Sequence, residues 1–127
     1  MQENLLFEYA VIRVVPHVER EEFINVGVIL FCAKQKFLRC IFHLDEKRLG
    51  VFSDSPDIGE LNEHILSFER ICKGGPDSGA IGKLTLAERF RWLTATRSTV
   101  LQTSKVHPGL CTDPDEMVQR LFTQLVK

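Results

Sequence analysis

Three runs of β-branched, aromatic and other apolar residues occupy the first third of the chain and predict three β-strands. They span 7–15, 23–33 and 37–43. Gly27 interrupts the second run, which predicts a bulge or a close approach of a neighbouring backbone. Only a short polar turn at 34–36 separates the second and third runs, so these two strands are predicted to be antiparallel.

Beyond the third strand, apolar residues recur at helical spacing. The pattern predicts a short helix over 45–52 and a long helix that begins with the Ser-Pro-Asp sequence at 55–57 and ends before the glycines at 74–75. A capping-box pattern opens a further helix over 85–94, and an Asp-Pro pair opens the last helix at 113. The residues of the long helix that are predicted to form one buried apolar face are Ile58, Leu61, Ile65, Phe68, Ile71 and Cys72.

A fourth strand is predicted over 98–103, and the His-Pro-Gly sequence at 107–109 predicts a turn. The elements therefore follow the order strand, strand, strand, helix, helix, strand, helix. This order predicts an α+β fold, in which a small antiparallel sheet of about four strands has helices packed mainly on one face. A length of 127 residues without internal repeats fits a single domain over 1–127.

The composition, 44% hydrophobic and 26% charged, is that of a globular protein. Because no signal-peptide pattern opens the chain and no apolar run approaches the roughly 18 residues of a membrane span, we expect a cytoplasmic protein without membrane contact. The four cysteines form no Cys-x-x-Cys pair and are expected to be reduced thiols. Cys32 and Cys40 are expected to face each other across the second and third strands, although a reducing compartment opposes a disulfide there.

The formal net charge of −1 gives the whole molecule no field that would attract nucleic acid or anionic lipid, so nucleic-acid binding is not expected. The segment 83–105 nevertheless carries five basic residues against one acidic residue. A solvated helix face explains this local charge better than a specific anion site does.

Several kinds of site are excluded by spacing. The glycine-rich loop at 74–82 lacks the P-loop pattern, and it follows a helix instead of a strand, so we expect a flexible surface connection. No pair of histidines or cysteines has zinc-ligand spacing, and no nucleophile elbow occurs. We therefore expect no metal and no cofactor.

Two polar constellations remain as candidate sites. The first combines acidic residues with an asparagine at the start of the second strand, and its ordinary interpretation is a solvated loop. In the second, an arginine would clamp a carboxylate or phosphate beside a histidine that titrates near neutral pH; its ordinary interpretation is a polar sheet face. The candidate residues are Glu19, Glu22, Asn25, Arg97, Ser98, Gln102 and His107.

Stretches spread over nearly the whole chain resemble one known family; they lie at 9–13, 19–30, 88–90, 97–98, 107–110, 113–114 and 121–122. On these residues the chain resembles the bacterial "domain of unknown function 3037" family, most specifically in the segment with Glu21, Asn25 and Gly27. The family has no assigned activity, so the resemblance transfers no catalytic residue. It implies an accessory or partner role beside kinases of the HipA-like type.

Two functions follow as hypotheses. The first is a non-catalytic accessory or protein-interaction module, because no complete catalytic motif is present; its partner, as the resemblance implies, is a kinase of that type. The alternative is an enzyme or ligand-binding domain for a phosphorylated or carboxylated small molecule. An exposed sheet edge would also allow a homodimer.

Overall fold

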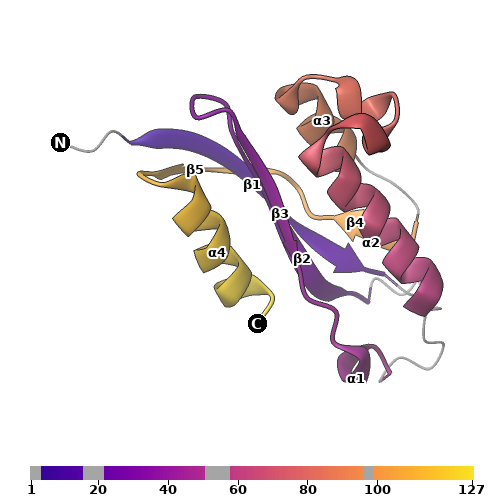
Figure 1. Cartoon of the computed structure of the whole chain (residues 1–127). Coiled ribbons are helices and arrows are strands. Elements are labelled where there is room, and N and C mark those ends of the chain that lie inside the picture. The colour runs from indigo at the N-terminus through magenta and orange to yellow at the C-terminus, as the bar shows by residue number, and fades with distance from the viewer. Residues whose placement is uncertain (1–3, 16–21, 51–57, 96–98) are drawn as a thin grey trace.

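In the described part of the chain, five strands form one antiparallel sheet (Figure 1). This computed structural model describes residues 4–15, 22–50, 58–95 and 99–127. β1 and β2 are the long central strands, and the order across the sheet is β3-β2-β1-β4, with β5 also paired to β1. The predicted α+β fold with an antiparallel sheet is confirmed. The strands are β1 (Leu5–Val14), β2 (Ile24–Cys32), β3 (Phe37–Phe42), β4 (Leu101–Thr103) and β5 (His107–Cys111).

The predicted turn at 107–109 is wrong, because these residues lie in β5. β4 pairs with the C-terminal part of β1 and β5 with its N-terminal part, so together they make one interrupted edge of the sheet. At the interruption Ser104 keeps the chain beside β1: its N–H donates to Val11 O at 2.8 Å, and its Oγ accepts from the Val11 N–H at 2.9 Å. Pro108, which has no N–H, is tolerated because β5 is an edge strand.

Helices lie on both sides of the sheet (Figure 1). α2 and α3 form the larger helical layer on one face, as predicted for most of the helices, and α4 packs on the opposite face, mainly against β2 and β3. The predicted capping box at Thr85 and the aspartate cap at Asp113 are both present. The predicted helix start at 55–57 lies outside the described residues. The helices are α1 (Glu46–Leu49), α2 (Ile58–Lys73), α3 (Leu86–Leu93) and α4 (Pro114–Leu125), with short 3-10 helices η2 (Pro76–Ser78) and η3 (Ile81–Lys83).

The sheet separates two hydrophobic clusters. The larger one lies beneath α2 and α3 and contains most of the predicted helical stripe, including Leu61, Ile65 and Phe68. The smaller one lies beneath α4, around Val28, Leu30 and Val118. β1 contributes alternate residues to both clusters, as the two-residue period of a strand requires.

Gly27 marks the predicted irregularity in β2. The register between β1 and β2 shifts here, since Ile12 pairs with Gly27 and the next residue, Arg13, pairs with Asn25. A Cβ on Gly27 would lie 2.7 Å from the carbonyl oxygen of Ile41 in β3. The bulge and the close backbone approach are therefore both confirmed.

The glycine-rich loop after α2 folds into η2 and η3, with Ser78 and Gly82 buried. The expectation of a flexible surface connection missed this local structure. Gly74 ends α2 with φ of 75°, a conformation that glycine adopts without strain.

The expected pairing of Cys32 with Cys40 is wrong. Cys32 pairs with Phe37 and belongs to the cluster beneath α4, whereas Cys40 pairs with Ile29 and packs against the cluster beneath α2. The two side chains therefore lie on opposite faces of the hairpin. Among the helices of the described residues, none is both long and apolar enough to cross a bilayer.

Candidate binding surface

A row of polar residues crosses three neighbouring strands on the α4 side of the sheet. Arg13 in β1 is directly opposite Asn25 in β2 on one side and Gln102 in β4 on the other. Cross-strand partners point to the same face of a sheet, so the three side chains share one surface.

Arg13 is the centre of this row. Its guanidinium carbon lies 4.1 Å from the centroid of the Phe23 ring, a cation–π contact. Its Nε is buried and has no hydrogen-bond partner among the described residues. The side chain as a whole is half-buried, so the aromatic contact orients a cation that still reaches the surface.

Asn25 connects this row to the end of α4. Its Nδ2 donates to the carbonyl oxygen of Leu125 at 3.0 Å, which satisfies one of the carbonyls left open at a helix C-terminus. Its Oδ1 is buried without a partner among the described residues. Gln102, by contrast, is held locally, because its Nε2 donates to Thr99 O at 2.8 Å.

An aromatic pair lies further along the same face. Tyr9 pairs with His107 across β1 and β5, and the two ring centroids are 5.4 Å apart. Tyr9 is half-buried and His107 is exposed. Arg13 lies four residues after Tyr9 along β1, which corresponds to about 13 Å. We name the whole face the Arg13 surface; it comprises Tyr9, Arg13, Phe23, Asn25, Gln102 and His107.

The structure brings some of the predicted site residues together. Asn25 and Gln102 flank Arg13, while His107 lies at the far end of the surface. Glu22 is exposed and directly precedes Phe23. Glu19, Arg97 and Ser98 lie outside the described residues.

Sequence reasoning missed Arg13 and Tyr9 as functional residues. The signal was present: Arg13 is the one charged position on its face of a strand whose other residues on that face are Phe7, Tyr9, Val11 and Val15. A charged side chain in such a stripe is costly to bury unless a partner or a surface role accompanies it.

The positive segment at 83–105 does not act as one anion-binding patch. Arg89 is buried and donates to the carbonyl oxygens of Ile71 and Cys72, each at 3.0 Å. Arg91 forms a bidentate pair with Glu8 at 2.9 and 2.8 Å. These hydrogen bonds raise the pKa of the Arg91 guanidinium. Two of the basic residues are therefore already paired with other groups of the protein, Arg89 in the interior and Arg91 at the surface.

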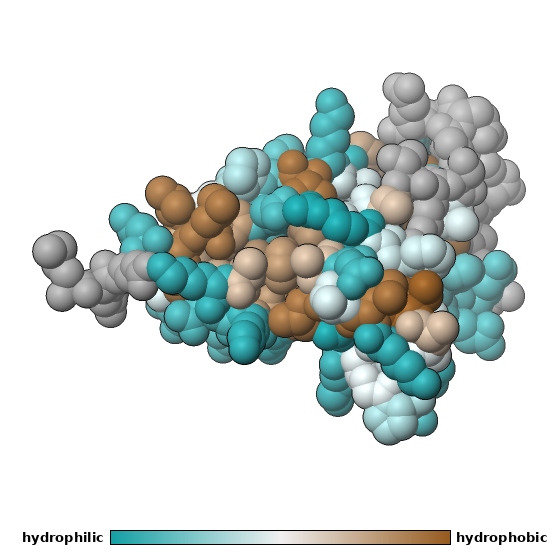
Figure 2. Space-filling view, turned by 90° about the horizontal axis from the view of Figure 1, so that it is seen from above, coloured by the Kyte–Doolittle hydropathy of each residue, from teal (hydrophilic) through white to brown (hydrophobic). Residues whose placement is uncertain are grey.

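An open hollow of about 400 Å³ lies along the exposed side of α4, whereas two clefts beside α2 are small. One of about 120 Å³ lies between α2 and β4, and one of about 250 Å³ between β3 and α2, both below the usual size of a ligand pocket. Within the described part of the chain, no three His, Cys, Asp or Glu side chains group as metal ligands would. Another exposed feature is the cross-strand pair Leu6 and Leu110; Figure 2 shows hydrophobic side chains gathered near the N-terminal end of the chain.

Comparison with known proteins shows to which family the chain belongs. The model of a family described as "Protein of unknown function (DUF3037)" matches residues 9–126. The chain belongs to the DUF3037 family. No curated protein and no solved structure matches it. In this DUF3037 protein the matched region contains every residue of the Arg13 surface.

Proposed function

We propose that this DUF3037 protein is a non-catalytic accessory module that binds a protein partner through the Arg13 surface. One observation carries the proposal: polar and aromatic side chains spread over about 13 Å of a partly exposed sheet face instead of converging in a cleft. A reacting group needs its catalytic partners within about 3 Å, and residues at the two ends of this face cannot both meet one small substrate. An extended partner contacts both ends at once.

The composition of the surface supports this proposal. Arginine and tyrosine are enriched where proteins bind each other, because each combines a large contact area with directional hydrogen bonds. The contact with Phe23 already orients Arg13, which reduces the entropy lost when a partner binds.

The partner class to test first is a kinase of the HipA-like type, which rests on the family resemblance described above. The proposal also includes a bacterial, cytoplasmic setting, in which such a kinase would be met. A homodimer through the outer edge of β3 remains a further proposal.

The test is a pull-down from native lysate with wild type, Arg13→Ala and Arg91→Ala. Arg91 is the matched control, because it is also a surface arginine but pairs with Glu8 on the other face of the sheet. We expect wild type and Arg91→Ala to capture the same stoichiometric partner and Arg13→Ala to retain less than about a tenth of it, as for a central interface arginine. Titration of the purified partner then gives the affinity of each variant.

Capture by all three proteins in equal amount would place the interface elsewhere. If wild type captured nothing, the interaction module would be rejected. A circular-dichroism melt of Arg13→Ala and a parallel Arg13→Lys variant would separate lost binding from lost folding.

A specific observation also favours a second candidate, a ligand-binding domain for a phosphorylated or carboxylated molecule. Arg13 Nε, a donor, has no partner among the described residues, and the Arg13 side chain lies on a partly exposed sheet face. Thermal-shift titration with inorganic phosphate and with citrate tests it: a saturable rise in Tm that Arg13→Ala abolishes is the expected result. No rise at millimolar concentration would reject it.

A further inference from the structure

Two thiols meet where the edge strand β3 packs on α2. Cys40 is half-buried on the α2-facing side of β3, and Cys72 is 4% exposed near the end of α2. Both side chains line the same cleft of about 250 Å³. Both cysteines are free thiols.

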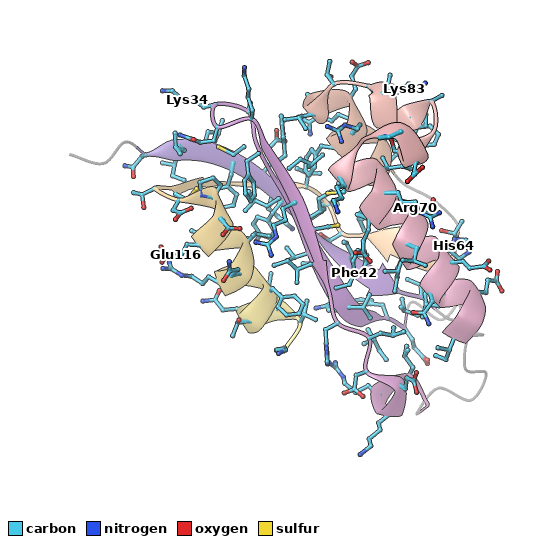
Figure 3. All side chains as sticks on the ribbon, viewed as in Figure 1. Lys34, Phe42, His64, Arg70, Lys83 and Glu116 are labelled. Atoms are coloured by element: carbon cyan, nitrogen blue, oxygen red, sulfur yellow. The ribbon has the colours of Figure 1, made fainter. Side chains whose placement is uncertain are left out.

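The packing of β3 against α2 positions Cys40 and Cys72 relative to each other. Phe42 of β3 lies on the α2 side (Figure 3), and its ring meets that of Phe68 edge-on with 5.5 Å between centroids. Cys40 lies two residues back along the strand, a step of about 6.6 Å. Cys72 lies four residues on along the helix, a step of about 6 Å. Because the two steps match, the aromatic contact sets Cys40 opposite Cys72.

The cleft gives small molecules access to this pair. Beside the two thiols it is lined by Leu38 and by three charged residues, Arg39, Glu69 and Lys73. Cys40 is the more exposed thiol and Cys72 lies behind it. An incoming reagent therefore meets Cys40 first.

We propose that Cys40 and Cys72 form a reversible dithiol–disulfide site that exchanges with low-molecular-weight disulfides such as oxidised glutathione. The Cys40 thiolate attacks one sulfur of the reagent, forms a mixed disulfide and releases one reduced thiol. The Cys72 thiolate then attacks the Cys40 sulfur, forms the internal disulfide and releases the second reduced thiol. The two protein thiols lose two electrons, which reduce the reagent disulfide to two thiols, and the two thiol protons pass to those products.

The surroundings set the speed of this exchange. The hydrogen bond with Cys72 and burial raise the pKa of the Cys40 thiol, Glu69 raises it further, and Arg39 opposes the rise. Lys73 is the other charged group beside the cleft. Since only the thiolate reacts, exchange is slow near neutral pH and accelerates about tenfold per pH unit while the thiol remains mostly protonated.

The experiment incubates reduced, full-length protein with oxidised glutathione at pH 8.5, alkylates the remaining thiols and maps peptides without reduction. We expect one linked peptide pair joining Cys40 to Cys72, with Cys32 and Cys111 alkylated. We also expect a rise in Tm of about 10 °C, because the cross-link restricts the unfolded chain between 40 and 72. Dithiothreitol should reverse both changes.

The other two cysteines provide the control. Cys32 is fully buried and Cys111 is 5% exposed, so a Cys111→Ala variant should still form the Cys40–Cys72 disulfide, whereas Cys72→Ala should stop at a glutathione adduct on Cys40. Four alkylated cysteines in wild type, a persistent glutathione adduct, or a first disulfide elsewhere would each overturn the proposal. No protein partner takes part, so the result is independent of the proposed function.

Discussion

Arg89 is the one charged side chain that is buried among the described residues, at 8% exposed. Its Nη1 donates to the carbonyl oxygens of Ile71 and Cys72 in the last turn of α2, where backbone acceptors have no partner within the helix. Its charge also faces the negative end of the helix dipole. Gly74 makes room for it, since a Cβ there would lie 2.6 Å from Nη1. One arginine thus joins α3 to the end of α2.

Replacing Arg89 by methionine, Arg89→Met, keeps most of the apolar stem but leaves those carbonyls unpaired. We expect the free energy of unfolding to fall by about 2–3 kcal/mol, measured by urea denaturation. Arg91→Met is the matched control: Arg91 is 56% exposed, and its loss should cost less than about 1 kcal/mol. Equal losses for the two variants would contradict the capping role of Arg89.

At the scale of elements, β2 combines a bulge with a close contact to β3. Because the carbonyl oxygen of Ile41 and the ring of Phe42 lie within 3 Å of where a Gly27 Cβ would be, the two strands depend on a residue without a side chain. The obstruction is partly backbone, which cannot move aside without separating β2 from β3.

The substitution Gly27→Ala should therefore lower the free energy of unfolding by about 2–3 kcal/mol, as overpacked core positions do. Gly50→Ala serves as its control, since the Cβ would meet only Glu46 O at 3.4 Å and Lys47 O at 3.5 Å, and its φ of −66° suits alanine. Chemical denaturation of both variants checks this pair. A Gly27→Ala protein as stable as Gly50→Ala would refute the close contact.

Prediction of helices and strands from the sequence succeeded where neighbouring residues determine the structure. It failed where the conformation depends on pairing with a strand that is distant in the chain. The caps at Thr85 and Asp113 are set by neighbours in the chain, and both were predicted. β5 was missed because proline and glycine at 108–109 are typical of a turn. In the structure Gly109 instead leaves room for Phe7, since a Cβ would lie 2.5 Å from Phe7 Cζ.

The same limit applied to the candidate site. Asn25 and Gln102 were identified by their polar character, but Arg13 was missed because its role depends on which strands flank β1. Strand order is set by packing of the whole chain, and no local sequence pattern determines it.

At the scale of the whole molecule, β1 is the strand on which the fold depends. It pairs with β2 along most of its length and with β4 and β5 on its other side, and its side chains enter both hydrophobic clusters. β4 contributes three residues and lies at the edge. Loss of β1 would separate the two halves of the sheet, whereas β4 can open while the rest stays folded.

Native-state hydrogen exchange should show this hierarchy. We expect amides of β1 and β2 to exchange only on global unfolding, and those of β4 to exchange at least about tenfold faster through local opening. β3, which is hydrogen-bonded on one side only, is the internal comparison. Uniform protection of all five strands would show instead that the sheet opens as one unit.

The bond from Asn25 to Leu125 has a practical consequence for handling the protein. It holds the end of α4 next to Arg13, so a tag or a fluorescent label fused after Lys127 would crowd the surface proposed to bind the partner. Leu5, the first residue of β1, lies at the opposite end of the strand, about 26 Å from Arg13. If the proposed partner binds at the Arg13 surface, attachment on the N-terminal side of β1 leaves that surface free, whereas a C-terminal fusion weakens capture and imitates a negative result.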